Sequence, residues 1–314
     1  MEDRVAPAAP KMCPRDGNLV SLKGGRKLGY AEYGDPAGPP ILYFHGFPAS
    51  RLEGFLHADA ASAAAVRLIA PDRPGIGLSD FAPQRTILDW AEDMRQFADH
   101  LELPRFAILG VSGGGPYALA CSLRLAHRTG ATGLVAPLGP VAEGKGSAGM
   151  NPFARLSLSL ARNHPRTFRL LYGGILVPLI RRRPPVILSL LRPSTADKPV
   201  VERPEIREKM QMSIREAFRK GGPGALHELY LFAQPWGFSL RKIYARVYLW
   251  QGGEDGTVPP SMGRFVADQL PACQYRFWSG EGHFSLPIAH GAELLAILRD
   301  ALVGPGPISQ RQGK

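Results

Sequence analysis

Short apolar runs alternate with amphipathic stretches along most of the chain. Residues 41–44 are apolar on both faces, as expected of a central parallel strand. Between Trp90 and Leu101, apolar side chains recur at helical spacing and give one apolar face. This alternation predicts an α/β fold, with a mostly parallel sheet covered by helices on both faces. We expect strands at 19–22, 27–33, 41–44, 66–70, 131–136, 246–250 and 274–278, and one more that begins at Arg105. We expect helices at about 51–65, 86–101, 260–270 and 290–302, and another that ends near His127.

The alternation stops between residues 141 and 240. This segment has helical patterns and many prolines but no good candidate for a strand, and the alternation resumes after it. This order fits one α/β core with a helical insertion better than two domains in series. The core is formed by residues 18–140 and 241–303, and the insertion by residues 141–240. The leader 1–17 and the tail 304–314 lack periodicity, which predicts disorder at both ends.

The strand that begins at Arg105 runs into Gly110-Val111-Ser112-Gly113-Gly114, and residues suited to a helix follow. The Gly-x-Ser-x-Gly spacing is that of a nucleophile elbow. A serine hydroxyl that stands clear at the end of a sheet needs a sharp strand-to-helix turn, in which the serine adopts a strained backbone angle. Side chains two residues away on either side would collide, so both positions are glycine. The pattern predicts that Ser112 is a nucleophile.

Two later loops offer the partners that a serine nucleophile requires. The serine needs a base, and the base needs a carboxylate that holds its tautomer. Residues 251–259 follow one predicted strand and contain Asp255, whereas residues 279–284 follow the next strand and contain His283. Loops at the carboxyl ends of parallel strands share one edge of the sheet, where open α/β sheets build their sites. The order along the chain is serine, acid, histidine.

Together these features resemble the α/β-hydrolase superfamily over nearly the whole chain apart from its ends. Five motifs carry the resemblance: His45-Gly46-Phe47-Pro48, residues 72–80, the elbow at 110–114, residues 252–259 and Gly280-Glu281-Gly282-His283. The resemblance implies that Ser112, Asp255 and His283 form a catalytic triad. It also implies that the helical insertion is the cap, or lid, of this superfamily.

The resemblance further implies an oxyanion hole formed by the backbone N–H groups of Phe47 and Gly113. Epoxide hydrolases and haloalkane dehalogenases of the superfamily share a segment similar to residues 45–48. They resemble each other in using aspartate as the nucleophile. Because position 112 is serine, the sequence argues against both activities.

Other residues near the motifs have simpler interpretations. Glu254 is an alternative acid, but the spacing to Val258-Pro259 favours Asp255. His45 is interpreted as a histidine that shapes the oxyanion loop, and Asp72-Arg73 as a structural pair beneath the site. The remaining histidines have no motif context and are expected on the surface or within helices: His57, His100, His127, His164, His227 and His290.

Composition narrows the function classes. The 314 residues include 38 Lys and Arg against 27 Asp and Glu, a formal net charge of +11. Such a charge would suit nucleic acid, but no nucleic-acid motif or basic stripe with interleaved aromatics is present, so we favour a solvated surface. Three scattered cysteines form neither a disulfide framework nor a zinc site, and Cys121 is expected to be buried. Without a signal peptide or spanning apolar run, we expect a cytoplasmic enzyme.

The insertion is basic and partly apolar. Between Glu143 and Asp197 it has no acidic residue, and its arginines are interleaved with apolar runs such as 186–191. One hypothesis is that it attracts anionic or acyl-chain substrates or rests on an anionic membrane surface. We favour the alternative that its apolar residues pack onto the core while its arginines face water. Six aromatic residues are candidates for pocket walls or for the interior of the insertion: Tyr172, Phe218, Tyr230, Phe232, Trp236 and Phe238.

These observations predict a serine hydrolase that cleaves a carboxylic ester, or a related acyl bond, of a small to medium and partly apolar substrate through an acyl-enzyme on Ser112. Aminopeptidase or amide, C–C bond and lactone hydrolysis remain open, because fold and triad alone do not separate them. A non-catalytic ligand-binding or signalling protein is the alternative class, but the complete set of motifs favours an enzyme. A serine triad needs no cofactor, and no metal-binding helix motif is present. The sequence does not predict the oligomeric state.

Overall fold

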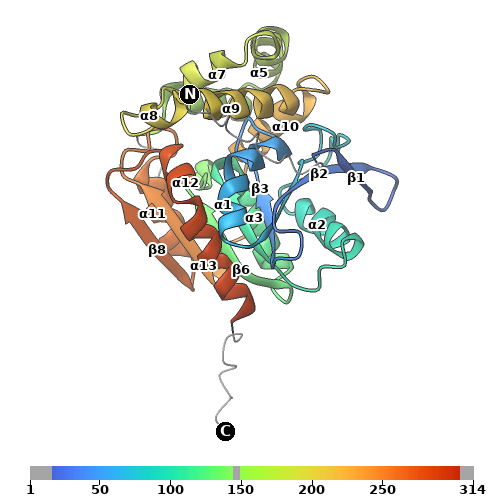
Figure 1. Cartoon of the computed structure of the whole chain (residues 1–314). Coiled ribbons are helices and arrows are strands. Elements are labelled where there is room, and N and C mark those ends of the chain that lie inside the picture. The colour runs from blue at the N-terminus through green and yellow to red at the C-terminus, as the bar shows by residue number, and fades with distance from the viewer. Residues whose placement is uncertain (1–15, 144–148, 305–314) are drawn as a thin grey trace, which may run out of the picture.

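The computed structural model describes residues 16–143 and 149–304, which form an eight-stranded sheet covered by helices on both faces (Figure 1). The strands are β1 Asn18–Ser21, β2 Lys27–Gly34, β3 Pro40–Phe44, β4 Arg67–Pro71, β5 Phe106–Val111, β6 Thr129–Val135, β7 Val247–Gly252 and β8 Cys273–Trp278. Their order across the sheet is β1-β2-β4-β3-β5-β6-β7-β8. β2 is antiparallel to β1 and β4, and all pairs from β4 to β8 are parallel. The predicted fold class is confirmed.

Strand burial follows the position of each strand in the sheet. Every residue of the central strand β5 is buried, as its continuous apolar run requires when helices cover both faces. At one edge, β1 and β2 form the predicted hairpin, in which Gly24 and Gly25 have φ angles of 88° and 84°. Such angles favour glycine because it lacks a Cβ atom. The opposite edge strand, β8, has no fully buried residue.

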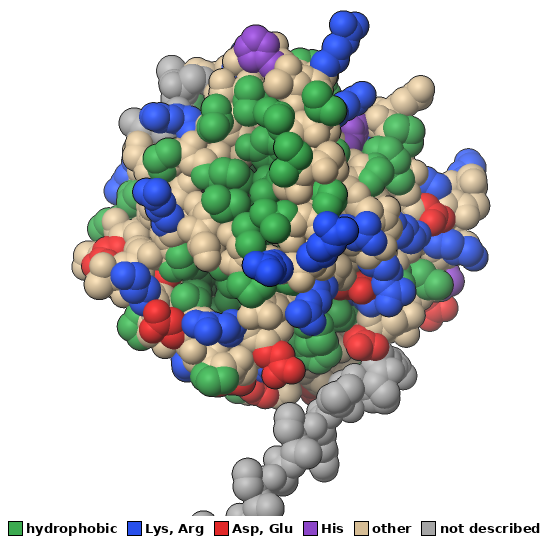
Figure 2. Space-filling model, turned by 90° about the horizontal axis from the view of Figure 1, so that it is seen from above, with side chains coloured by type: hydrophobic (Ala, Val, Ile, Leu, Met, Phe, Trp, Pro, Cys, Tyr) green, Lys and Arg blue, Asp and Glu red, His purple; other side chains and the backbone are tan. Residues whose placement is uncertain are grey.

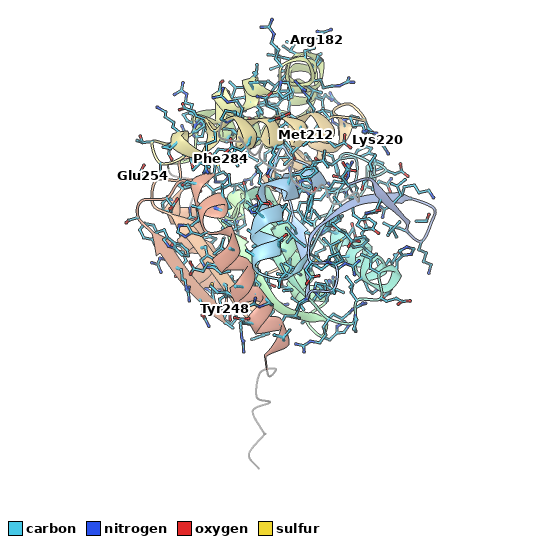
Figure 3. The ribbon with its side chains drawn as sticks, in the orientation of Figure 1. Arg182, Met212, Lys220, Tyr248, Glu254 and Phe284 are labelled. Atoms are coloured by element: carbon cyan, nitrogen blue, oxygen red, sulfur yellow. The ribbon has the colours of Figure 1, made fainter. Side chains whose placement is uncertain are left out.

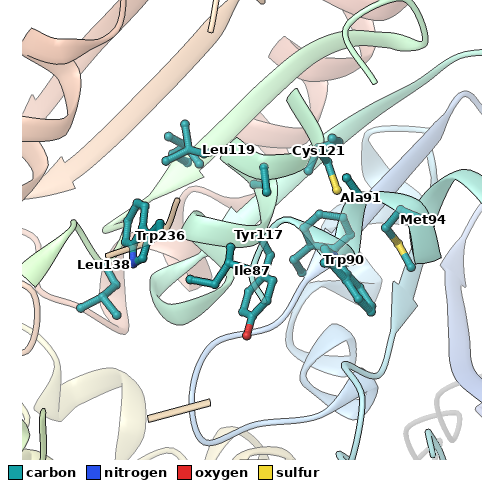
Figure 4. Close-up of a cluster of buried hydrophobic side chains, with 14 of the residues drawn as sticks. Ile87, Trp90, Ala91, Met94, Tyr117, Leu119, Cys121, Leu138 and Trp236 are labelled. Atoms are coloured by element: carbon teal, nitrogen blue, oxygen red, sulfur yellow. The ribbon is translucent and has the colours of Figure 1, made fainter. Parts of the chain in front are cut away.

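The two faces of the sheet are covered by different helices. On one face lie α1 Ala58–Ala63 and α13 Gly291–Val303; on the other lie α2 Asp89–His100, α3 Gly115–Arg124 and α11 Pro260–Gln269. Figure 4 shows the second face, where Trp90 and Met94 of α2 approach Tyr117 and Cys121 of α3. Trp90 and Tyr117 meet edge to face, with ring centroids 6.1 Å apart. Cys121 is buried there as a packing residue, as predicted.

Helix boundaries differ from the sequence expectation at residues 51–65 and at the end of the helix after the elbow, whereas the last helix agrees within one residue at each end. Residues 51–65 form a 3₁₀ helix, η1 Arg51–His57, followed by the short α1, and the chain leaves helical geometry at Ala65, whose φ is 51°. The helix expected to reach His127 ends at Arg124, because Leu125 leaves helical backbone angles. The last helix starts at Gly291 and is preceded by the short α12 Ser285–Ala289. The helix start at residue 86 was nearly right: α2 begins at Asp89, and Thr86 and Asp89 exchange the reciprocal bonds of a capping box.

The described part of the insertion, 141–143 and 149–240, is helical and contains no strand. Its longer helices are α4 Pro152–Asn163, α5 Pro165–Phe168, a π-helical stretch η4 Arg169–Leu176, α6 Val177–Arg182, α7 Pro185–Leu191, α8 Lys198–Val201, α9 Pro204–Ala217 and α10 Pro223–Ala233. Each of the seven α-helices has a proline at its first or second position. Proline fits there because the first helical N–H groups have no partner within the helix. The prolines therefore start helices rather than prevent them.

The insertion lies across the end of the sheet at which the parallel strands finish (Figure 1). Seen from that side, apolar side chains lie among lysines and arginines (Figure 2). The arginines between 155 and 192 are exposed, as predicted, but Leu156, Leu170 and Ile175 are also 55%, 72% and 64% exposed. The expectation that the apolar residues pack onto the core is therefore wrong for these three. Among the described helices, none has the length and hydropathy needed to cross a bilayer. The predictions for 1–15 and 305–314 lie outside the described residues.

Candidate active site

Ser112 lies at a sharp turn between β5 and α3. Its φ is 52°, in the left-handed region that non-glycine residues rarely adopt. A Cβ atom on Gly110 would lie 2.7 Å from the Cβ of Ala118, and one on Gly114 would overlap the backbone oxygen of Phe44. Both glycines are therefore required by close packing. A backbone conformation of this kind costs roughly 1–3 kcal/mol, and such residues cluster at functional sites.

His283 and Asp255 lie next to Ser112 in a chain of hydrogen bonds. His283 Nε2 is 3.1 Å from Ser112 Oγ, and His283 Nδ1 is 2.8 Å from Asp255 Oδ2. The other carboxylate oxygen, Oδ1, accepts the backbone N–H groups of Thr257 and Val258 at 2.9 and 2.8 Å. These bonds fix the carboxylate, which in turn fixes the imidazole ring. With Nδ1 donating to Asp255, Nε2 of the neutral ring is free to accept the serine proton.

The electrostatics of the site favour a basic His283. Burial disfavours the charged ring and lowers the pKa of His283, but the Asp255 carboxylate outweighs that effect, so the pKa lies above its ordinary value.

The pKa of the second histidine near the site, His45, is shifted in the opposite direction. Burial and the charge of Arg73 lower the pKa of His45 to about 3, and its Nδ1 is 2.9 Å from the carbonyl oxygen of Gly46. His45 is thus a buried, neutral part of its loop.

The loop after β3 brings Phe47 beside the elbow. A Cβ atom on Gly113 would lie 2.9 Å from the Cβ of Phe47, so the two residues are adjacent. Arg73 Nη2 donates to the carbonyl oxygen of Gly46 at 3.0 Å. Because C=O and N–H point in opposite directions in a trans peptide unit, the N–H group of Phe47 points away from Arg73. The peptide bond between Phe47 and Pro48 is cis.

Comparison with protein families identifies the family of the chain. A family model for the alpha/beta hydrolase fold matches residues 39–288. This chain belongs to the α/β-hydrolase fold family.

Within this family, the curated relatives match only part of the chain. Over 117 residues it is 36% identical to the dihydrolipoyllysine-residue acetyltransferase component of the acetoin cleaving system of Pseudomonas putida, covering 37% of this chain and 31% of that protein. Over 125 residues it is 34% identical to haloalkane dehalogenase 2 of Mycobacterium tuberculosis, covering 38% and 41%. The matches thus span less than half the length of these relatives. Esterase RhEst1 from Rhodococcus sp. ECU1013 has the same fold, with a TM-score of 0.65, 20% identity and coverage of 92% and 98%.

In this α/β hydrolase, a buried ion network connects the loop after β3 to the insertion. Arg73 forms two hydrogen bonds to Glu228 of α10, at 2.5 Å from Nε to Oε1 and 3.0 Å from Nη2 to Oε2. Arg85 adds a contact of 3.2 Å to the same carboxylate. Burial alone would raise the pKa of Glu228, but Arg73 and Arg85 lower it to about 2. Asp72 pairs with Arg51 instead. The prediction that Asp72 and Arg73 are structural fits these contacts, although each has a separate partner.

Asp197 is a site residue that the sequence analysis missed. It lies in the insertion and is 1% exposed. Its Oδ1 accepts the N–H groups of Phe284 and Ser285 at 2.7 and 2.9 Å, and its Oδ2 accepts that of His283 at 3.2 Å. A Cβ atom on Gly282 would overlap Asp197, which explains the glycine before the histidine. The only signal in the sequence was that Asp197 is the first acidic residue after Glu143.

The acid loop distinguishes the two acidic candidates. Asp255 contacts His283, whereas Glu254 is exposed and its Oε2 accepts only the N–H group of Ala196, at 3.3 Å. Figure 3 shows Glu254 and Phe284 at the end of the sheet that faces the insertion, with Tyr248 toward the opposite end. The triad candidates therefore lie where the strands finish.

Above Ser112 lies a cavity whose two arms meet at this residue. The first arm is lined by Tyr43, Glu53, His57, Met210, His283 and Phe284, and the second by Gly113, Met150, Phe153, Leu158, Leu229 and Phe232. Six residues line both arms: Phe47, Pro48, Ser112, Ile187, Leu191 and Thr257. Helices of the insertion close the cavity over the elbow, because Ile187 and Leu191 belong to α7 and Phe232 to α10.

The cavity distinguishes between the interpretations that the sequence left open for the aromatic residues and for His57. Of the six aromatic candidates, Phe232 lines the cavity, whereas Tyr172 and Phe218 are buried in the packing of the insertion. His57, expected on the surface or in a helix, ends η1 but is only 3% exposed and lines the first arm. Within the described ranges, no three His, Cys, Asp or Glu side chains are arranged to hold a metal ion.

Proposed function

We propose that the protein is a serine hydrolase that cleaves a carboxylic ester, or a related acyl bond, through an acyl-enzyme on Ser112. The observation that carries the proposal is the continuous chain of hydrogen bonds from Ser112 Oγ through His283 to Asp255, with the serine at a strained elbow. This is the constellation that a weakly nucleophilic hydroxyl needs in order to react at neutral pH. The substrate is a small molecule of small to medium size.

In the acylation step, Ser112 Oγ attacks the carbonyl carbon and its proton passes to His283 Nε2. The π electrons of the carbonyl group move onto its oxygen, which becomes the oxyanion. When this intermediate collapses, the bond to the leaving group breaks and His283 returns the proton to the leaving oxygen. Water then attacks the acyl-enzyme in the same way, which releases a carboxylic acid and regenerates the serine. Asp255 keeps the ring in the required tautomer and stabilises the imidazolium.

The oxyanion accepts hydrogen bonds from the backbone N–H groups of Phe47 and Gly113 in this proposal. Two observations support this assignment. Phe47 and Gly113 are adjacent, and the hydrogen bond from Arg73 to the carbonyl oxygen of Gly46 turns the N–H group of Phe47 away from Arg73. Donors that are fixed in advance cost no reorganisation when charge develops, so loss of one typically reduces turnover about 10²–10³-fold. The insertion acts as the cap that excludes bulk water from this reaction.

Partly apolar acyl groups are favoured because the side chains of the second arm are apolar except for those of Ser112 and Thr257. Haloalkane dehalogenase 2 is a relative by sequence, but dehalogenases of this superfamily use an aspartate nucleophile, and residue 112 is serine. Amide, C–C bond and lactone hydrolysis use the same machinery and remain alternatives within the proposal.

Labelling with a fluorophosphonate probe tests the proposal. The wild-type protein should react covalently, the variant Ser112→Ala should not, and Ser62→Ala, at an exposed serine on α1, should react like the wild type. A panel of p-nitrophenyl esters of increasing chain length, with aminoacyl and lactone substrates beside it, then defines the bond that is cleaved. A folded wild-type protein that never reacts with the probe would indicate a non-catalytic binding protein.

A further inference from the structure

The two arms of the cavity differ in what they offer a substrate, and this difference assigns them to the two halves of an ester. His283, which must protonate the leaving oxygen, lines only the first arm. Gly113, a proposed oxyanion donor, lines only the second arm. The leaving group therefore occupies the first arm and the acyl group the second. This step rests on the proposed function.

The first arm contains a carboxylate that is only partly satisfied. Glu53 Oε2 accepts the hydroxyl of Tyr43 at 2.8 Å and the N–H group of Gly46 at 2.6 Å. Within the described residues, no hydrogen-bond donor contacts the other oxygen, Oε1. That oxygen would lie 3.2 Å from a Cβ atom on Gly46, and the same position is 3.6 Å from the Cβ of Ser112. Glu53 Oε1 thus borders the cavity close to the nucleophile.

His57 adds a second polar group to the same wall. Its ring packs on Tyr43, with centroids 5.1 Å apart, and its side chain has no hydrogen-bond partner among the described residues. Burial, with a smaller effect of Lys209, lowers the pKa of His57 to about 4, so the ring is neutral at pH 7. Most of the other side chains of this arm, such as Leu56 and Met210, are apolar.

Binding sites of this type are apolar pockets in which a few convergent polar groups fix the orientation of the ligand. We propose that Glu53 and His57 form a subsite for the leaving group and select esters whose alcohol carries a hydrogen-bond donor, a second hydroxyl or an ammonium group. Glu53 is then a specificity-determining residue that also supports the oxyanion loop through Gly46. A leaving group without a donor leaves this carboxylate unpaired when water is displaced, which is the usual basis for strong discrimination.

Three butyrate esters of similar size test this subsite. The alcohol part of the ester is a 2-hydroxyethyl, a protonated 2-(dimethylamino)ethyl or a propyl group, and only the propyl group lacks a hydrogen-bond donor. The release of butyric acid is followed by titration at constant pH. We expect kcat/KM for at least one donor ester to exceed that for the propyl ester by about tenfold or more. If kcat/KM exceeds that of the propyl ester for both the hydroxyl and the ammonium ester, the subsite selects a hydrogen-bond donor. If it does so for the ammonium ester alone, the same carboxylate selects a positive charge.

The variant Glu53→Gln separates selection from support of the loop. Its amide oxygen can still accept the N–H group of Gly46, but the cavity then meets an NH₂ donor instead of an acceptor. We expect the ratio between donor and propyl esters to fall to within about threefold of unity, since the acceptor is lost. The matched control Glu208→Gln removes the same charge at an exposed position of α9, and the ratio should remain that of the wild type.

Two results would overturn the inference while leaving the proposed function intact. The first is a wild-type protein that hydrolyses all three esters without preference. The second is a Glu53→Gln variant in which all three rates fall in proportion, since Glu53 would then act only through the oxyanion loop. If no ester is cleaved and the fluorophosphonate probe does not react, the proposed function fails together with the subsite.

Discussion

At the scale of single residues, the candidate site depends on carboxylates whose two oxygens have different tasks. Asp255 uses Oδ1 for two backbone N–H groups and Oδ2 for His283. Glu53 uses Oε2 for the oxyanion loop and presents Oε1 to the cavity. Because hydrogen bonds to one oxygen hold each carboxylate, the direction of the other oxygen is fixed as well.

Replacing Asp255 by asparagine should change both the rate and its pH dependence. His283 acts as a base only when neutral, so activity is lost as pH falls through its pKa, which lies above 6.5 in the wild type. The Asp255 carboxylate is the largest of the contributions that raise this pKa, ahead of Asp197 and Glu53, so in Asp255→Asn the acid limb of kcat/KM should move to lower pH. Turnover should fall about 10⁴-fold, because the amide favours the wrong tautomer.

The measurement is a pH profile of ester hydrolysis between pH 5 and 9. The neighbouring Glu254→Gln provides the control, since the Glu254 side chain is exposed and accepts a hydrogen bond from the N–H group of Ala196, outside the hydrogen-bond chain of His283. An acid limb that stays in place in Asp255→Asn would mean that Asp255 does not set the pKa of His283.

At the scale of elements, the insertion contributes directly to the histidine loop. Asp197 precedes α8 and accepts three successive backbone N–H groups, from His283 to Ser285. These groups precede and begin α12, so one carboxylate satisfies amides that would otherwise be buried without partners. The loop thus takes its position from a segment about 86 residues earlier in the chain.

Asp197 is therefore predicted to be a positioning residue. In Asp197→Ala the loop loses all three acceptors, and kcat of the folded protein should fall at least about tenfold, because small displacements of a catalytic group are costly. Asp197→Asn keeps one oxygen for Phe284 and Ser285 and should recover part of the loss. Glu202→Gln, at the exposed end of α8, is the control.

The readouts are kcat, KM and the rate of fluorophosphonate labelling, each measured well below the unfolding temperature. A role in stability alone would lower that temperature but leave the labelling rate of the folded protein unchanged.

The elements themselves were largely predictable from sequence, and the contacts between them were not. The strands, the hairpin at Gly24-Gly25 and the capping box at Thr86 depend on neighbours in sequence, so local patterns identify them. Motifs likewise selected Ser112, Asp255 and His283, which lie within hydrogen-bond distance, although their catalytic roles stay predictions. Asp197 has no local signature, because the backbone groups that it accepts lie 86 or more residues later in the chain. Glu53 contacts Tyr43 and Gly46 of the preceding strand and loop, but no motif of the sequence included it.

Helix ends were less predictable for a related reason. The segment 51–65 has helical spacing, yet its first half winds as a 3₁₀ helix with Gly54 packed against the ring of Tyr33. A pattern of apolar residues reports burial of one face but not how tightly the backbone must wind to fit its neighbour.

At the scale of the whole molecule, the insertion is attached to the sheet by buried polar contacts at separate places. Glu228 meets Arg73, Glu216 meets Arg51, and Ser213 meets Ser50. Apolar packing extends across the same boundary, since residues of α4 and α10 belong to one hydrophobic cluster with α2 and α3. Core and insertion are therefore expected to unfold in a single transition.

Removing one member of the buried pair tests this coupling. Glu228→Gln leaves Arg73 with a buried and unbalanced charge, so the free energy of unfolding should fall by about 3–5 kcal/mol. The wild-type contribution should be present above the pKa of about 4.5 that an unfolded glutamate has, and it should be lost as pH falls towards about 2.

Denaturant unfolding followed by fluorescence and by circular dichroism gives both the stability and the number of transitions. The exposed Glu205→Gln on α9 is the control and should change stability by less than about 0.5 kcal/mol. Separate transitions for the two probes in the wild type would contradict the single cooperative unit.

The carboxylate of Asp197 also has a consequence for engineering. Exchanging caps between members of a fold family is an attractive way to transfer substrate preference, because the cap supplies much of the cavity wall. In this chain the insertion, proposed above to act as the cap, also carries the acceptor for the backbone of the histidine loop. A chimera that combines this core with a foreign cap would need an aspartate at the same place, or else a redesigned loop after β8, before any change in specificity could be observed.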